Sequence, residues 1–238
     1  MPSSLHDLRR AARRQARRRV RRTVHAVRPP AAVRAYLAAH AVAKLNVGAG
    51  GALLDGWLNT DRDPAPGAVY LDVTRRFPVP DAVFHRALVE HVIEHVTLEA
   101  GRHMLRECAR VLAPGGRIRV STPDLERIAA LCTDGGDPAA QRYVAWAAGA
   151  FCSDQRGNPA ALVVNNAFRN WGHAFLYDEE TLRSALADAG FVDVVRLLYA
   201  QTDDEHLAGA EGAGIDDHGR SMRAFESVAL EARRGYET

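Results

Sequence analysis

Two glycines and two acids stand where a nucleoside could be bound. Gly48 and Gly50 follow an apolar segment at residues 43–47, and glycine lets the backbone turn sharply and lets a ligand approach main-chain atoms. Asp61 closes the next apolar segment, 13 residues after Gly48, and Asp72 closes the one after that. Carboxylates in such places can accept hydrogen bonds from ribose hydroxyls. A G-x-G spacing alone is also typical of a simple strand-to-loop turn.

A parallel sheet would bring these residues together, since the strand ends of such a sheet meet at one edge. Strands are predicted at residues 43–47, 57–60, 68–72, 87–89, 117–121, 191–198 and 222–231. Helices are predicted at 31–41, 98–112 (with Thr97 as N-cap), 125–132, 141–151 and 178–189 (with Asp178 as N-cap), and loops at 153–172 and 201–220. The alternation predicts an α/β fold with a doubly wound, mostly parallel sheet.

Four motifs, taken in order, resemble those of class I S-adenosylmethionine-dependent methyltransferases. They are LNVGAG at residues 45–50, WLNTD at 57–61, EHVIEH at 90–95 and RVLAPGG at 110–116. More narrowly, they are similar to predicted methyltransferases associated with bacterial surface-polysaccharide pathways. The resemblance covers roughly residues 44–200 and implies a Rossmann-like, seven-stranded sheet with an antiparallel last strand, formed by residues 222–231, and an insertion after the fifth strand.

The resemblance also implies S-adenosylmethionine as the cofactor and assigns residues to it. Gly48 and Gly50 would flank its methionine portion. Asp61 would accept hydrogen bonds from the ribose hydroxyls, and Asp72 would face the adenine amine.

The chain departs from the family pattern just after this turn. A third spaced glycine would fall at Ala52, and residues 53–56 are too few to form a helix. We therefore expect the helix that follows the turn in the family to be missing.

The EHVIEH motif supports two interpretations. In the methyltransferase interpretation Glu90 and His91 border the sulfonium side of the cofactor, His95 positions the turn, and the chain binds no metal. His91 to His95 also satisfies H-x-x-E-H, an inverted zinc-protease signature. On a helix, His91 and His95 would share a zinc ion with Glu94 as the base.

The segment 165–177 collects polar and aromatic side chains that suit a sugar or another polyhydroxylated acceptor. We assign acceptor binding to Arg169, Trp171 and Tyr177, and to His218 from a second polar cluster. A hydroxyl acceptor needs a base, and His173 or His91 is the candidate. The alternative is that the aromatic residues anchor the insertion and the asparagines form turns.

The first 28 residues form a basic arm. They hold ten arginines and one acid, a net charge of +9, whereas the remaining 21 basic and 28 acidic residues give −7. A helix over residues 9–22 would gather the arginines on one face, suited to an anionic membrane surface or to nucleic-acid phosphates. The arm lacks aromatic residues, which disfavours single-stranded nucleic acid, and a solvated arm is the plain alternative. Residues 28–30, Arg-Pro-Pro, mark the boundary between the arm (1–28) and a methyltransferase domain (31–238) with an insertion at about 135–177.

The composition is that of an ordinary globular protein, with 47% hydrophobic and 25% charged residues. No apolar stretch approaches the roughly 20 residues of a membrane helix, and the basic N-terminus lacks the apolar segment of a signal peptide. Three cysteines without C-x-x-C spacing, at positions 108, 132 and 152, argue against a disulfide framework or a structural zinc site. We expect a cytoplasmic protein that lies at the inner face of the membrane if the arm binds there.

Taken together, the residues and the resemblance predict methyl transfer from S-adenosylmethionine to a small hydroxylated acceptor, such as a surface-polysaccharide sugar. One alternative is an RNA or protein methyltransferase that holds an acidic target with the arm. Another is a non-catalytic subunit that only binds the cofactor.

Overall fold

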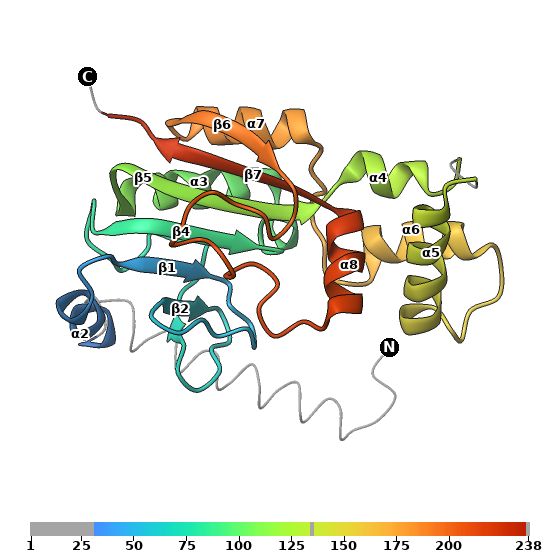
Figure 1. The fold of residues 1–238 in the computed structure, drawn as a ribbon, viewed down its shortest axis with the longest axis horizontal. Coiled ribbons are helices and arrows are strands. Elements are labelled where there is room, and N and C mark those ends of the chain that lie inside the picture. Colours follow the sequence, from blue (N-terminus) through green and yellow to red (C-terminus); the bar gives the residue numbers. More distant parts are fainter. Residues whose placement is uncertain (1–30, 134–135, 237–238) are drawn as a thin grey trace.

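A seven-stranded sheet forms the centre of the molecule in the computed structural model, which describes residues 31–133 and 136–236 (Figure 1). Its strand order is β3-β2-β1-β4-β5-β7-β6. β7 pairs antiparallel with both β5 and β6, and the other neighbouring strands pair in parallel. The predicted α/β sheet with an antiparallel last strand is confirmed. The strands are β1 (Lys44–Val47), β2 (Leu58–Asp61), β3 (Val69–Tyr70), β4 (Phe84–Glu90), β5 (Leu112–Pro123), β6 (Phe191–Leu197) and β7 (Ser227–Arg234).

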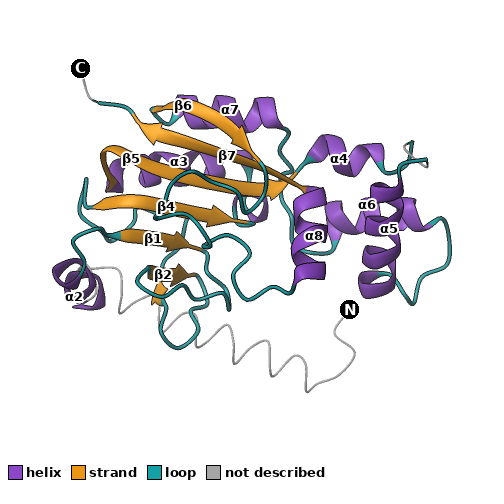
Figure 2. Cartoon of the chain, viewed as in Figure 1, coloured by secondary structure: helices purple, strands orange, loops and turns teal. Residues whose placement is uncertain are grey.

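Helices α3 and α7 cover one face of the sheet, where the main core lies (Figure 2). Thr97 caps α3 by accepting a hydrogen bond from the Ala100 amide at 3.3 Å, and Asp178 caps α7 through the Thr181 amide at 2.7 Å, so both predicted caps are confirmed. The helices of the described residues are α2 (Ala31–Ala39), α3 (Leu98–Val111), α4 (Leu125–Ala130), α5 (Pro138–Phe151), α6 (Pro159–Arg169), α7 (Glu179–Asp188) and α8 (Asp217–Glu226).

The connection from β6 to α8, residues 198–216, covers part of the other face of the sheet. Leu88 points to this face because side chains alternate along β4, and it packs with Leu54 and Trp57 before β2 and with Leu207 and Ala210 of the connection. Residues 48–57, between β1 and β2, contain no helix, as expected. The connection thus provides the apolar cover that a helix at this place would provide.

Buried ion pairs fasten the connection to the sheet. Arg119 of β5, only 1% exposed, donates to Glu211 at 2.5 and 2.9 Å and to Glu231 of β7 at 2.8 Å. Arg86 of β4 donates to Asp204 at 2.7 Å. The acids of a segment predicted only as loop are therefore the partners of arginines on neighbouring strands.

A second, smaller core joins α4, α5, α6 and α8 beside the sheet. Tyr143 and Val163 are fully buried there, with Met222 of α8 packed against them. Two predictions were wrong here. Residues 159–169 form α6, although 153–172 was expected to be loop, and α8 takes residues 217–226, so the last strand begins at Ser227 and not at residue 222.

The domain limits stay a prediction. α5 and α6 fall inside the predicted insertion at about 135–177, whereas the basic arm, residues 1–28, lies outside the described residues. Of the helices that are described, none has both the length and the apolar character of a transmembrane span.

Candidate active site

The turn after β1 is shaped by glycine. Gly48 and Gly50 have φ angles of +70° and +54°, which L-residues rarely adopt. A Cβ at Gly48 would lie 2.4 Å from a methyl group of Val92, whereas a Cβ at Gly50 or Gly51 would meet no atom within 4 Å. The Gly50 amide donates to Asp61 Oδ2 at 2.9 Å. The turn and the acid thirteen residues later therefore meet, and the surface of the turn leaves room for a ligand.

The two acids predicted at the strand ends differ in their surroundings. Asp61 is partly exposed, and its Oδ1 accepts a hydrogen bond from the Asp63 amide at 2.6 Å. Asp72 is 6% exposed and accepts from the amide and hydroxyl of Thr74 at 3.1 and 2.6 Å. Asp61 thus stands at the glycine turn with an accessible edge, whereas Asp72 stabilises a local turn.

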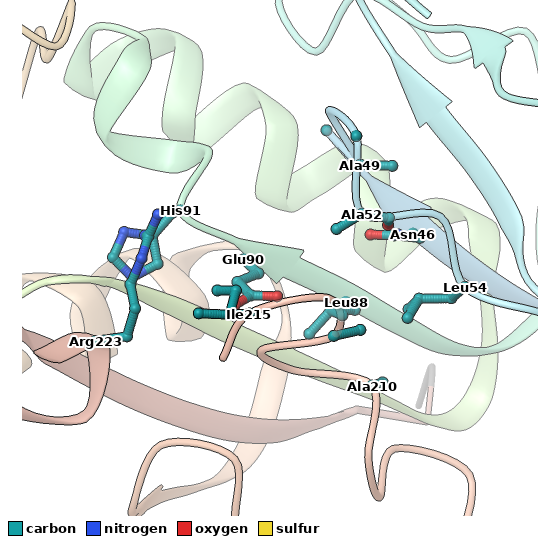
Figure 3. A pocket seen from close by; sticks show the side chains of 13 residues that line it. Asn46, Ala49, Ala52, Leu54, Leu88, Glu90, His91, Ala210, Ile215 and Arg223 are labelled. Atoms are coloured by element: carbon teal, nitrogen blue, oxygen red, sulfur yellow. Dashed lines mark hydrogen bonds between the residues drawn. The ribbon is translucent and has the colours of Figure 1, made fainter. Parts of the chain in front are cut away.

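A cavity of about 190 Å³, here called the cofactor-side cavity, lies between the glycine turn and the 198–216 connection. Figure 3 shows Glu90 and Ile215 near its middle, with His91 and Arg223 on one side and Ala49 on the other. The cavity is lined mainly by glycine and aliphatic residues, and neither Asp61 nor Asp72 belongs to its lining. The lining residues are Asn46, Gly48, Ala49, Gly51, Ala52, Leu54, Leu88, Glu90, His91, Ala210, Ala213, Ile215 and Arg223.

Glu90, at the end of β4, ties the connection to this cavity. Its Oε1 accepts hydrogen bonds from the Tyr199 hydroxyl at 2.5 Å and from the Gly212 amide at 3.0 Å. Burial, together with the nearby charge of Glu90, raises the pKa of Tyr199, so Tyr199 remains a hydrogen-bond donor at neutral pH. The Glu90 carboxylate thus lines the cavity and also holds the 198–216 connection in place beside it.

His91 follows Glu90 with a left-handed backbone, at φ 50°. Its Nε2 lies 2.8 Å from Ser227 Oγ, its Nδ1 lies 3.4 Å from Glu94 Oε1, and its amide donates to the Ser121 carbonyl at 2.9 Å. A non-glycine residue at positive φ is strained and persists where surrounding contacts fix it. These contacts therefore hold the imidazole in one orientation.

A second cavity, of about 280 Å³, lies on the other side of His91 and is here called the acceptor-side cavity. It is lined by aromatic and ionisable side chains, and Trp171 stands edge-on to Phe151 with ring centroids 4.9 Å apart. His91 and Arg223 line both cavities, so the two spaces adjoin at these residues. The lining residues are His91, Glu94, His95, Pro123, Trp146, Phe151, Trp171, His173, Arg223 and Glu226.

The ionisable groups of this cavity influence one another. Burial favours the neutral form of Glu94, but the adjacent His91, 3.4 Å away, outweighs burial and lowers the pKa of Glu94 below its ordinary value. Burial lowers the pKa of His173, and the neighbouring His95 adds to the effect. At neutral pH the cavity therefore holds a carboxylate and a neutral His173.

The residues predicted to bind the acceptor divide into two groups. Trp171 lines the acceptor-side cavity, and the exposed His218 packs edge-on against Trp146 of its wall with centroids 6.5 Å apart. Arg169 is exposed at the end of α6 and lies outside the lining. Tyr177 is a correction, because it is fully buried in the main core and does not reach the cavity.

Sequence reasoning missed several wall residues. Arg223 and Glu226 come from α8, where a strand was predicted, and their side chains lie 3.7 Å apart. Trp146 and Phe151 come from α5, a segment that was predicted only as a helix. A helical pattern over residues 217–226 is the signal that places Arg223 and Glu226 on one face.

The H-x-x-E-H motif does not form the helix that a zinc protease requires. Only Ile93–His95 are helical, as a single 3₁₀ turn, and His91 precedes it with its left-handed backbone. The ring of His95 instead faces that of His173, with centroids 5.0 Å apart. The arrangement of two histidines with Glu94 as the base is therefore wrong.

Residues 45–120 match the family model of a methyltransferase domain. The chain carries a class I S-adenosylmethionine-dependent methyltransferase domain. The match begins at β1 and ends in β5, so it includes the glycine turn, Asp61 and Glu90. S-adenosylmethionine is the cofactor, and the open glycine turn, its main-chain amides and the partly exposed Asp61 are groups that fit a nucleoside with an amino-acid tail.

Solved structures similar to the methyltransferase include several enzymes of this type. They include a SAM-dependent methyltransferase from Archaeoglobus fulgidus (16% identity, 90% of this chain and 94% of that chain, TM-score 0.49) and one from Mesorhizobium loti (16%, 85% and 96%, TM-score 0.48). The CurJ carbon methyltransferase is similar at 13% identity and TM-score 0.45 over 82% of this chain, which spans about half (49%) of that chain. No curated protein matches the sequence.

Proposed function

We propose that this methyltransferase acts on a hydroxyl group of a small polyhydroxylated acceptor, such as a sugar of a surface polysaccharide. The observation that supports the proposal is the pair of cavities that adjoin at His91 and Arg223. Methyl transfer from a sulfonium requires chiefly that the acceptor oxygen stand behind the methyl group and that water be excluded. Two adjoining cavities with one shared wall provide that alignment.

We assign the cofactor to the cavity with the glycine turn. Gly48 and Gly50 would flank its methionine portion, Asp61 would accept from the ribose hydroxyls, and Glu90 and His91 would border the sulfonium. The accessible edge of Asp61 beside the turn supports this placement. Buried Asp72 would shape the rim through Thr74 instead of touching the adenine.

We assign the acceptor to the cavity with the aromatic wall. Trp171 and Phe151 offer apolar ring surfaces, while Arg223 and Glu226 offer a donor and an acceptor of hydrogen bonds, a combination that suits a sugar. The half-buried Arg223 also suits an anionic substituent on the acceptor. A cavity of about 280 Å³ admits a small acceptor, and the net charge of −7 on residues 29–238 disfavours a nucleic acid.

The base would be His91 or His173, which line the acceptor side. In this step the acceptor oxygen forms a bond to the methyl carbon, the sulfur keeps the electron pair of the broken bond, and the hydroxyl proton passes to the imidazole. Neutral His173 can accept a proton at neutral pH because its pKa is lowered. His91 stands where the two cavities adjoin.

The test uses the full chain with methyl-labelled S-adenosylmethionine and four classes of acceptor: sugar nucleotides, oligosaccharides, RNA and protein. The proposal predicts label on a saccharide, and a drop in kcat for His91→Ala or His173→Ala. His40→Ala, whose ring stacks on Tyr36 away from both cavities, is the control. Label on RNA or protein would support a role for residues 1–28 in holding an acidic target, and cofactor binding without label on any acceptor would support a non-catalytic subunit.

A further inference from the structure

We propose that Glu94, His95 and His173 form a binding site for a divalent first-row transition-metal ion, with Zn²⁺ as the probe, open to the acceptor-side cavity. Each residue offers one ligand atom, and the three atoms lie within 4.8 Å of one another. All three residues line the acceptor-side cavity. Two imidazole nitrogens and one carboxylate oxygen form a ligand set that zinc uses in catalytic sites, where a fourth position stays open.

Two buried polar atoms point to a missing ligand. Glu94 is fully buried, and its Oε2 accepts from the Thr122 hydroxyl at 3.0 Å, whereas its Oε1 has only a longer ion-pair contact with His91 Nδ1 at 3.4 Å and no well-aligned hydrogen bond. His173 Nδ1 is also buried without a hydrogen-bond partner. Leaving such atoms unsatisfied destabilises the fold, and more so for a charged group. A cation placed among them would satisfy the carboxylate oxygen directly.

The backbone holds the two segments of the site together. The Glu94 carbonyl accepts hydrogen bonds from the Ala174 and Phe175 amides at 2.7 and 3.2 Å, which fixes residue 173 beside the 3₁₀ turn. His95 Nε2 already lies 4.0 Å from Glu94 Oε1. The site is therefore joined by main-chain contacts between segments about eighty residues apart in the sequence.

Metal binding would require a small inward movement of side chains. Zinc lies roughly 2.0–2.2 Å from nitrogen and oxygen ligands, so tetrahedral ligand atoms stand about 3.3–3.5 Å apart. The His95 side chain is 43% exposed, so a rotation toward the ion would not disturb the core. His91 Nδ1, 3.4 Å from Glu94 Oε1, and Thr122 would then be the groups that orient the carboxylate.

The role of the metal ion in catalysis rests on the proposed function, methyl transfer to a hydroxyl group of the acceptor. With His173 as a ligand, the open position would face the acceptor hydroxyl and stabilise the negative charge that develops on its oxygen. His91 would then receive the proton. Metal binding itself does not depend on the acceptor, so the two proposals can be tested separately.

The experiment measures metal binding by the full chain after removal of metal with a chelator. Zn²⁺ is titrated against a chromophoric chelator, and Co²⁺ is added separately to record its visible spectrum. We expect one ion per chain, with His95→Ala and His173→Ala each weakening binding by about 100-fold or more and abolishing the Co²⁺ absorption. His206→Ala, a partly exposed histidine of the 198–216 connection, is the matched control, and Cys132→Ser removes the exposed thiol.

Glu94 is buried, so a loss of zinc binding in Glu94→Gln could reflect a damaged fold. His95 is exposed, and His95→Ala, which should leave the fold intact, is therefore measured alongside it. A rise in Tm with Zn²⁺ in the wild type and in His206→Ala, but not in His95→Ala, would support the site. Zinc affinity that is the same in wild type, His95→Ala and His173→Ala would overturn it, as would absence of binding at micromolar Zn²⁺. Calorimetry with S-adenosylhomocysteine in the absence of metal reports on the cofactor site independently.

Discussion

The cofactor-side and acceptor-side cavities share His91 and Arg223 but are built in different ways. The cofactor side is lined mainly by glycine and aliphatic residues, and the 198–216 connection beside it is held by the partly buried Glu90 and the buried Glu211. The acceptor side is lined by large aromatic and ionisable side chains, of which Trp146 and Trp171 pack against a separate small core. A constant ligand can be bound by fixed main-chain geometry, whereas a specific acceptor requires side chains that differ between enzymes. The comparison predicts that backbone changes will damage the first cavity most and side-chain truncations the second.

The largest effect is expected from Gly48→Ala. The new methyl group would lie 2.4 Å from Val92, and the residue would keep a left-handed backbone. Left-handed strain of about 1–2 kcal/mol and overpacking of about 1–3 kcal/mol together should lower the free energy of unfolding by roughly 2–5 kcal/mol. Denaturant unfolding and S-adenosylhomocysteine binding would both show it.

Gly51→Ala is the matched control for the unfolding measurement, because a Cβ there meets nothing within 4 Å. Similar losses in the two variants would show that the conformation of Gly48 is not what shapes the turn.

The next effect in size is expected from Asp204→Asn, which tests how the 198–216 connection is held against the sheet. Burial opposes ionisation of Asp204, but the hydrogen bond and charge of Arg86 outweigh it and lower its pKa. Breaking this buried pair should cost about 2–3 kcal/mol of unfolding free energy at neutral pH. A carboxylate with a lowered pKa stabilises the fold above its unfolded pKa of roughly 3.9, and this stabilisation is lost as the pH falls through the folded pKa. The difference between wild type and variant should therefore shrink in acid.

Asp203→Asn provides the comparison, since Asp203 is 86% exposed and pairs with Arg117 at 3.3 Å on the surface. Its effect should be about 0.5 kcal/mol or less. Equal effects at positions 203 and 204 would contradict the role of the buried pair in holding the connection.

Trp171→Ala should give a smaller effect, confined to the acceptor side. Loss of an aromatic surface worth about 0.5–1.5 kcal/mol should raise KM for the acceptor roughly 2- to 13-fold. Affinity for S-adenosylhomocysteine should not change, because Trp171 lies outside the cofactor-side cavity. Steady-state kinetics and calorimetry measure the two quantities, and Arg169→Ala, exposed and off the cavity, serves as control. A change in cofactor affinity with no change in acceptor KM would reverse the assignment of the cavities.

The sequence predicted the cofactor side better than the acceptor side for physical reasons. The glycine turn, Asp61 and Glu90 lie within the short motifs that carry the family resemblance, and the structure places Asp61 at the turn and Glu90 in the cavity beside it. The acceptor side joins residues from α5, α8 and the 170–173 segment, and its small core decides which of them meet. Tyr177 shows the limit, because its place beside Trp171 in the sequence gave no sign that it turns into the main core.

The two helices that were not predicted, α6 and α8, each begin with a residue that caps the helix, but the composition of their flanks favoured loop. Asn158 caps α6 through the Ala160 amide at 3.0 Å with Pro159 next to it, and Asp216 caps α8 through the Gly219 amide at 2.7 Å. Polar and glycine-rich flanks favoured loop at both places. Packing of Val163 and Met222 in the small core stabilises these helices, and that contact lies far outside any local window.

The most direct test of the central claim is calorimetry with S-adenosylhomocysteine on the wild type, Asp61→Ala and Asp55→Ala. Asp61 accepts the Gly50 amide at 2.9 Å and stands where the ribose is assigned, whereas Asp55 is an exposed acid of the neighbouring loop. We predict that Asp61→Ala weakens binding by about 1.5–3 kcal/mol, roughly 10- to 150-fold in Kd, and that Asp55→Ala leaves it unchanged. Equal affinities for all three proteins would contradict the placement of the cofactor at the glycine turn.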